Sequence, residues 1–306
     1  MIAEKGEAAA ASAAAIDIAA AAQLACLLEA SAPKPGNVSP GRHFHDLRYE
    51  DFLASAAAIG APLAGAGTRP LGETIRLAIE ATARWTRSNA NLGIVLLLAP
   101  LARAASIGGG DLRAAVRRVL DETTVDDARN VYAAIRQAAP GGLGAVEEQD
   151  VSSDPTLPLA DVMRLAAGRD AIAREYAAAF ELTFLTGVPA LERARNDGLA
   201  WDAAAVETFL TLLAAAADTH IARRGGPALA EEVSRQAREA LAAGGVRSAG
   251  GREAIDRMDR ALRDGRHLAN PGAAADLTAA AIFVVLLGGG WQTPGSRRGG
   301  RNAASR

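Results

Sequence analysis

Residues 91–105 read NLGIVLLLAPLARAA, and this stretch decides the fold class. Its apolar run, residues 94–98, lies inside a longer helical pattern and lacks the alternation of a half-buried strand. The apolar residues 92–101 are far fewer than the ~20 that a transmembrane helix needs. We therefore predict a buried helix, closed by the glycines at 108–110.

The rest of the sequence has the same character. Half of the 306 residues are hydrophobic, only 4% are aromatic, and alanine, the strongest helix former, dominates. This composition predicts an all-α fold with almost no sheet. Because no stretch resembles a hinge, we predict a compact single-domain multi-helix bundle over residues 13–288, with two domains as the alternative. Residues 1–12 are predicted to be a disordered start, and residues 289–306 a disordered basic tail.

Helical periodicity divides the domain into antiparallel neighbours joined by short turns. Two prolines and a glycine end the first helix at 33–36, and Gly60 with Pro62 ends the second. The pattern that starts at residue 159 pauses at 187–189 and continues to His220. Residues 139–158 hold three glycines and three prolines without periodicity, which indicates a functional loop or a solvated surface excursion. Further helices are predicted at 71–82, 111–120, 125–138, 228–243, 252–263 and 273–287.

Charge and cysteine content restrict partners and location. Lys and Arg number 33 against 35 Asp and Glu, so the formal charge of −2 gives no general attraction to nucleic acid or to an anionic membrane. Cys26, the only cysteine, is predicted to be a small core residue, and the chain suits a reducing cytoplasm. Asp17 and Gln23 interrupt the apolar residues 8–28, which argues against a leader or a membrane span. The sequence does not choose between a monomer and a homo-oligomer.

Four polar clusters break the alanine- and leucine-rich pattern, each at a helix end, where free backbone N–H groups suit phosphate binding. None matches a Walker sequence, a dinucleotide fingerprint or a kinase loop. The first cluster is Pro33-Lys34-Pro35-Gly36-Asn37-Val38. The prolines stiffen this loop, and Gly36 lets the backbone approach a ligand. Lys34 is either a point charge for a phosphate or a solvated loop lysine.

A histidine pair and a carboxylate follow the first cluster. Asp46 is a candidate functional carboxylate or, equally, a helix N-cap. His43 and His45 form an H-x-H pair, but without a nearby third ligand the pair is weak support for zinc.

The second and third clusters carry amides and guanidinium groups. Asn89 and Asn91 flank the start of the buried helix, where an Asn caps the helix or hydrogen bonds to a base or ribose edge. The third cluster covers residues 218–226. Its arginines fit phosphate oxygens bidentately, although a helix C-terminus also attracts arginines. It contains Asp218, His220, Arg223, Arg224, Gly225 and Gly226.

The fourth cluster is Asn270-Pro271-Gly272, a turn that opens an apolar helix with Asp276 one turn in. The residues around Asp276 are wholly apolar, so its carboxylate is predicted to lie close to the core. An ionised carboxylate there needs a partner such as a cation or Mg²⁺.

Taken together and in order, these clusters resemble the triphosphoribosyl-dephospho-coenzyme A synthase family, from about residue 18 to residue 288. The resemblance is carried by the joint occurrence of four motifs, which is far more specific than any one of them. They are Pro33-Lys34-Pro35-Gly36-Asn37-Val38, Asn89-x-Asn91-Leu92-Gly93, Asp218-x-His220-Ile221-Ala222-Arg223-x-Gly225-Gly226 and Asn270-Pro271-Gly272-x-x-x-Asp276-Leu277.

The resemblance implies an all-α transferase that takes ATP and 3′-dephospho-CoA, releases adenine and attaches the triphosphoribosyl group to the ribose 2′-hydroxyl. Displacement at the anomeric carbon needs a carboxylate near the developing positive charge and an acid for adenine. The implied roles are Lys34, Arg223 and Arg224 on the triphosphate, Asp276 and Asp218 as Mg²⁺ ligands or base, Asn89 and Asn91 on base or ribose, and Asp46 and Glu175 as reserve carboxylates. Gly36, Asn37, Gly225, Asn270 and Gly272 complete the predicted nucleotide-binding set.

One departure from the family bears on the substrate. Its citrate-lyase and malonate-decarboxylase branches carry an Asn-Thr-His-Lys-Gly type motif where Asn89-Ala90-Asn91-Leu92-Gly93 stands here, so a His and a Lys are absent. Residues 142–151 and Arg169-Asp170-x-x-x-Arg174-Glu175-Tyr176 look like the branch of methylotrophs, planctomycetes and archaea. Two alternatives follow: an enzyme of one-carbon coenzyme synthesis with another phosphorylated donor and acceptor, or a helical module that binds a nucleotide without turnover.

Overall fold

The structure, a computed structural model, describes residues 2–263 and 265–292. Within these residues it is all-α, with no strand beyond one bridging pair, Ser39 and Arg42, which confirms the predicted fold class. A π-helix at Thr183–Gly187 and a 3-10 turn at Gly245–Arg247 interrupt the α-helices. These are α1 (Ile2–Ser31), α2 (Tyr49–Ala58), α3 (Gly60–Ala64), α4 (Leu71–Ala83), α5 (Leu92–Ile107), α6 (Leu112–Asp121), α7 (Val125–Ala138), α8 (Leu159–Ala166), α9 (Ala171–Ala177), α10 (Val188–Asn196), α11 (Trp201–Ala215), α12 (Thr219–Gly225), α13 (Pro227–Ala242), α14 (Ala249–Leu262) and α15 (Gly272–Leu287).

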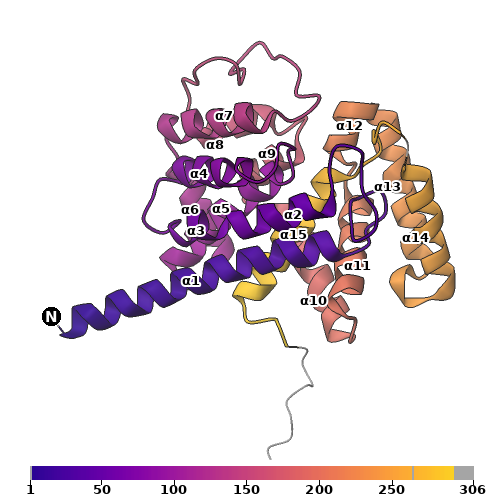
Figure 1. Cartoon of the computed structure of the whole chain (residues 1–306), viewed down its shortest axis with the longest axis horizontal. Helices are drawn as coiled ribbons and strands as arrows, with labels where there is room; N and C mark the ends of the chain where they lie inside the picture. The colour runs from indigo at the N-terminus through magenta and orange to yellow at the C-terminus, as the bar shows by residue number, and fades with distance from the viewer. Residues whose placement is uncertain (1, 264, 293–306) are drawn as a thin grey trace, which may run out of the picture.

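Two apolar helices, α5 and α15, form the centre of the molecule. Their sequences are hydrophobic all round, so neither has a face for solvent over most of its length. In Figure 1, α1 passes across the front of α15. The helices α4, α7 and α8 lie on one side of this pair, and α12, α13 and α14 lie on the other. One hydrophobic cluster joins residues of α1, α5, α11 and α15. The amino-terminal ends of α5 and α15 thus meet inside the bundle.

Several helix boundaries differ from the sequence prediction. The helical pattern predicted from residue 159 to residue 187 is divided, because α8 ends at Ala166 and α9 begins at Ala171 after the cap by Asp170. Residues 206–220 do not form one helix, because α11 ends at Ala215 and α12 begins at Thr219. The carboxylate of Asp218 accepts the backbone N–H groups of His220 and Ile221 at 2.8 and 3.1 Å, and this cap starts a new helix. Gly60 does not end the helical region but begins α3, after a single residue outside α2.

The two ends of the chain bear on the predicted termini. Residues 2–12, for which we predict a disordered start, have a helical backbone continuous with the rest of α1. In the predicted tail, Trp291 stacks on Trp201 with ring centroids 5.5 Å apart. The remainder of that tail, residues 293–306, lies outside the described residues.

The structure also bears on the cysteine and on the apolar helices. Cys26 is buried, as predicted for a core residue, and burial raises the pKa of its thiol. Among the described residues, no single helix has the length and apolar character to cross a membrane. Only α5 and α6 taken as a pair reach that length, and they are bent by 109° relative to each other.

Candidate active site

Two adjoining cavities lie at the helix ends that carry the predicted clusters. The polar cavity, of about 490 Å³, is lined by Asn37, Asn91, Arg224, Asn270 and other residues. The aliphatic cavity, of about 620 Å³, is lined by side chains such as Leu96, Val131, Ile135, Val162 and Met163. The residues that line both are Asn89, Leu92, Gly93, Gly141, His220 and Asp276.

Asp276 stands where the two cavities meet, as the only acidic side chain that lines both of them among the described residues. Its carboxylate lies against the amino-terminal turn of α5, where a Cβ at Gly93 would come within 2.0 Å of Asp276 Oδ2. Burial, followed by the negative charges of Glu29, Asp218 and Asp170, raises the pKa of Asp276 well above its ordinary value. Within residues 2–263 and 265–292 no side chain forms a salt bridge with it.

A buried ion pair lies beside Asp276. Lys34 is fully buried and pairs with the carboxylate of Glu29 at 2.9 Å, and its ammonium also donates to the backbone carbonyls of Glu29 and Ala32. Lys34 is therefore not a solvated loop lysine. It lines neither cavity, whereas Glu29 faces the polar one. The lysine that we predict to hold a phosphate thus holds Glu29 in this structure.

Asp218 joins two helix starts. One oxygen caps α12, and the other accepts the backbone N–H of Ala274, in the first turn of α15, at 2.8 Å. Burial is the largest influence and raises the pKa of Asp218 to about 6. Both oxygens are engaged by backbone groups, and Asp218 lines neither cavity, so its geometry is that of a structural bridge.

His220 lies between the two cavities because a glycine faces it. A Cβ at Gly272 would come within 2.6 Å of the His220 ring, so only glycine lets the ring lie against the start of α15. Burial, with the positive charges of Arg223 and Arg224, lowers the pKa of His220 to about 4. The imidazole is therefore neutral at pH 7 and available as a hydrogen-bonding group.

The predicted asparagines gather along the polar cavity. The amide of Asn37 donates to the side-chain oxygen of Asn270 at 2.5 Å, which ties the loop after α1 to the turn before α15. Asn91 occupies the N-cap position of α5, but its side chain donates to Thr82 at 3.0 Å, and Asn89 accepts the backbone N–H of Leu92, the first residue of α5, at 3.1 Å. Asn89 also lines both cavities, so its hydrogen bond to the helix start is compatible with the predicted binding function.

The two predicted arginines face different cavities. Arg223 lines the aliphatic cavity and pairs with Asp170 at 3.0 Å, while Arg224 lines the polar cavity and contacts His220 at 3.4 Å. Both stand in the last turn of α12, which ends at Gly225. Gly225 lines neither cavity.

The long connection at 139–158 covers the aliphatic cavity. Tyr132 Oη donates to the carbonyl of Gln149, and Arg136 donates to that of Val151 at 2.7 Å, so the loop is tied to α7. Leu143, Gly144 and Val146 are among its residues that line the cavity. The loop therefore lines a cavity, and the interpretation that it is a functional loop stays a prediction.

Gly36 and Glu175, like Lys34, Asp218 and Gly225, line neither cavity. Gly36, with φ of 76°, does not approach an open space, since its N–H donates to Asp259 at 2.9 Å and a Cβ there would contact Leu262 at 3.0 Å. Glu175 is fully buried and accepts hydrogen bonds from Leu182 and Thr183, so it holds the turn that precedes the π-helix. Desolvation raises its pKa.

Three further residues contribute to this region without a role predicted from the sequence. Glu29 lies near the end of α1, and its signal is an acidic residue directly after the mostly apolar residues 18–28. Asp170 caps α9 through Ala173 N–H at 3.0 Å and pairs with Arg223, and it belongs to a quoted branch motif without a predicted role. His220 belongs to the third cluster, and the sequence predicts no role for it.

His45 and Asp46 lie with His267 at the mouth of the polar cavity.

The acidic residues around Asp276 offer limited support for a metal. The predicted pair contributes only one carboxylate to the cavities, because Asp218 is engaged by backbone N–H groups. In the described part of the chain, no three ligand groups converge around Asp276. Mg²⁺ commonly takes one or two carboxylates and fills its shell with phosphates and water, so Asp276 alone fits as a protein ligand of a magnesium–nucleotide complex.

Comparisons with known proteins place this architecture. Residues 15–294 match the family described as ATP:dephospho-CoA triphosphoribosyl transferase. Proteins of Pseudomonas putida and Klebsiella pneumoniae that bear the name 2-(5''-triphosphoribosyl)-3'-dephosphocoenzyme-A synthase are 36% identical over 103 residues and 33% identical over 102 residues. Each alignment spans 33% of this chain and 36% of the relative, so the chain matches about a third of the length of these curated proteins.

A solved structure covers more of the chain. The crystal structure that bears the name triphosphoribosyl-dephospho-CoA synthase, from Archaeoglobus fulgidus, is 29% identical. It superposes with a TM-score of 0.61 and covers 78% of this chain and 99% of its own. The family match over most of the chain, with the shared helical architecture, means that this chain belongs to the ATP:dephospho-CoA triphosphoribosyl transferase family.

Proposed function

We propose that this protein transfers the triphosphoribosyl group of ATP to the 2′-hydroxyl of 3′-dephospho-CoA and releases adenine. The observation that carries the proposal is Asp276, whose carboxyl stands at the junction of two cavities and has a raised pKa. A group transfer between two bound substrates needs such a junction. The family match favours this reaction over the one-carbon coenzyme and non-catalytic alternatives.

Cavity chemistry suggests which substrate binds where. The polar cavity offers Arg87, Arg224 and several amides, which suit the triphosphate and ribose of ATP. The aliphatic cavity suits the pantetheine arm of dephospho-CoA, and Arg169 and Arg223 at its edge suit the diphosphate. This assignment places the reacting ribose groups of both substrates near Asp276.

A single carboxyl can balance the protons of this reaction. Burial and the neighbouring carboxylates raise the pKa of Asp276, which favours its protonated form, and in that form it would give a proton to adenine as the bond between the base and the anomeric carbon breaks. The carboxylate so formed stabilises the developing positive charge and takes the proton of the attacking 2′-hydroxyl as the new bond forms. Glu29 and Lys34 would set the charge around it, and neutral His220 would orient a ribose hydroxyl.

Mg²⁺ belongs to the proposal as the partner of the triphosphate, whose charge it would neutralise. Asp276 is the protein group that would hold it, and this role competes with proton transfer by the same oxygen atoms. The two roles have different consequences in an amide variant, because loss of a ligand raises the Mg²⁺ requirement, whereas loss of an acid lowers turnover at saturating Mg²⁺.

The direct test is adenine release. Purified protein is incubated with Mg-ATP, with and without dephospho-CoA, and free adenine and the acceptor are followed by chromatography and mass spectrometry. Adenine that forms only with dephospho-CoA, together with an acceptor heavier by one triphosphoribosyl group, supports the proposal. If folded, ATP-binding protein releases no adenine, the proposal is wrong. Adenine release with a different acceptor would favour the one-carbon coenzyme alternative. ATP binding without adenine release, whichever acceptor is present, would favour the non-catalytic alternative.

A further inference from the structure

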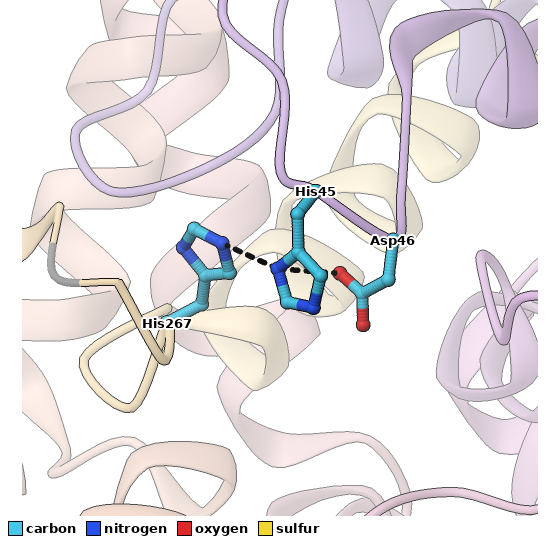
Figure 2. Close-up of side chains that lie close together, drawn as sticks. All are labelled: His45, Asp46 and His267. Atoms are coloured by element: carbon cyan, nitrogen blue, oxygen red, sulfur yellow. Dashed lines mark hydrogen bonds and ion pairs between the residues drawn. The ribbon is translucent and has the colours of Figure 1, made fainter.

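Two segments far apart in the sequence bring three metal-ligating groups together at the mouth of the polar cavity. His45 and Asp46 belong to the loop between α1 and α2, and His267 belongs to the connection between α14 and α15 (Figure 2). One ligand atom from each lies within 4.8 Å of the other two. No other such group of three occurs in the part of the chain that the structure describes. The fold thus gives His45 two potential co-ligands, Asp46 and His267, and leaves His43 outside the group.

The spacing of the nitrogen atoms fits a shared ion. His45 Nδ1 and His267 Nε2 are 3.3 Å apart. In this structure the two nitrogens share a hydrogen bond, and two imidazole nitrogens at ~2.0–2.1 Å from one ion in tetrahedral geometry would lie about 3.3–3.4 Å apart, so an ion could replace that hydrogen bond with little movement of the rings. Asp46 Oδ1 is 3.7 Å from His45 Nδ1, and the exposed carboxylate can rotate into the remaining gap.

One of the three ligands is already oriented by packing. The ring of His267 stacks on that of the buried Phe44, with centroids 3.9 Å apart and planes at 21°. The backbone of Asp46 is fixed as well, because its carbonyl accepts a hydrogen bond from Ser88. An ion therefore needs to order little more than the His45 and Asp46 side chains, which lowers the entropic cost of binding.

We infer that His45, Asp46 and His267 bind a divalent transition-metal ion of the Zn²⁺ or Co²⁺ class. Two imidazole nitrogens and one carboxylate favour such an ion over Mg²⁺, which prefers oxygen ligands. Three protein ligands leave at least one coordination position open, and Asp46 and His267 both line the polar cavity. The ion also links the loop after α1 to the turn before α15, next to the hydrogen bond between Asn37 and Asn270.

Cobalt supplies a readout that does not depend on activity. The full-length protein, treated with a chelator and then freed of it, is titrated with Co²⁺, and the visible absorption of the bound ion is recorded. We expect one saturable site per chain, displacement by Zn²⁺, and no displacement by a large excess of Mg²⁺. Absence of stoichiometric binding would overturn the inference.

Variants locate the site. His267→Ala and His45→Gln should each weaken Co²⁺ binding on the order of 100-fold, because each removes a direct ligand. His43→Ala, in the same exposed loop but outside the trio, is the matched control and should bind as the wild type does. Equal Co²⁺ affinity in all four proteins would show that the ion binds elsewhere. Thermal unfolding without metal checks that each variant is folded.

A role for the open position rests on the proposed function. If the polar cavity holds ATP, a phosphate oxygen can enter that position, and ATP should then change the spectrum of bound Co²⁺. An unchanged spectrum in a protein that binds both ATP and Co²⁺ would separate the metal from the nucleotide. Metal binding is measured without nucleotide, so failure of the proposed reaction leaves that result interpretable.

Discussion

Asp276 has a raised pKa and lines both cavities. Its replacement by asparagine distinguishes proton transfer from Mg²⁺ binding as the role of this residue. We expect Asp276→Asn to lower kcat by about 10²–10⁴-fold at saturating Mg²⁺, because an amide keeps the shape but can neither give nor take the proton. The measurement is the initial rate of adenine release, with ATP affinity measured separately.

The matched control is Asp256→Asn, an exposed position on α14 outside both cavities. It should leave turnover unchanged. A wild-type kcat in Asp276→Asn, with only a higher Mg²⁺ requirement, would assign Asp276 to the metal rather than to proton transfer. Unchanged kinetics in every respect would remove the residue from the mechanism.

Asp218 predicts a pH dependence of stability. Its pKa rises from 3.8 to about 6 on folding, mainly through burial, so between these values the folded state binds more protons than the unfolded state. Stability conferred by the neutral carboxyl is therefore complete below pH 4 and lost as the pH rises through 6. An asparagine stays neutral at every pH, so the free energy of unfolding of Asp218→Asn should rise by about 3 kcal/mol relative to that of the wild type between pH 4 and pH 7. Urea unfolding of both proteins at a series of pH values measures this difference. Parallel stability profiles of the two proteins would contradict the prediction.

At the residue scale, the sequence predicted which segments come together better than it predicted the contacts of each side chain. Four helix-end clusters do meet around the cavities, because helix ends expose backbone groups and glycines. Gly36 could not be assigned in advance, since its partner Asp259 comes from α14, 223 residues away. Lys34 pairs with Glu29, only five residues earlier in α1, but the sequence does not show that both side chains are buried together. His267 could not be linked to His45 because 222 residues separate them.

At the scale of helices, the end of α1 before two prolines and a glycine was predictable, whereas Gly60 and Pro62 lie inside α3 and do not end the helical region. Boundaries set by tertiary contacts were not predictable. The predicted helix at 125–138 coincides with α7, whose start is capped by Thr124 and Asp127. The break between α11 and α12 escaped prediction because apolar spacing continues through it. Only the Asp218 cap, which also serves α15, shows why the chain turns there.

The contact between α4 and α7 depends on one glycine. The N–H of Gly72 donates to Asp127 at 2.7 Å, and a Cβ at this position would lie 2.4 Å from the backbone oxygen of Asp127. Gly72→Ala should therefore force the helices apart and destabilise the fold by about 1–3 kcal/mol, measured by thermal or urea unfolding.

The control for this contact is Gly250→Ala, where the nearest atom to an added Cβ is 3.7 Å away. That substitution should be neutral or slightly stabilising, because alanine favours the helix. If both variants lose the same stability, the loss reflects glycine replacement in general and not the packing of α4 on α7.

For the whole molecule, the loop at 139–158 should determine how the acceptor is held. Leu143 is half exposed and lines the aliphatic cavity, so Leu143→Ser should raise KM for dephospho-CoA about fivefold to tenfold with little change in KM for ATP. Leu165→Ser, equally exposed on α8 but outside the cavity lining, should change neither value. An equal rise in both KM values would indicate that the loop supports the fold rather than the acceptor.

The shared wall of the two cavities also constrains the order of events. Because both cavities open onto the carboxyl of Asp276, donor and acceptor can be bound at the same time. The sugar can then pass directly from donor to acceptor without a covalent intermediate on the protein. Kinetics should then require a ternary complex, with intersecting double-reciprocal lines. Isotopically labelled adenine should not exchange into ATP while the acceptor is missing. The configuration of the new linkage then reports the geometry: retention would indicate that the base and the hydroxyl meet Asp276 on one face of the sugar, and inversion that they lie on opposite faces.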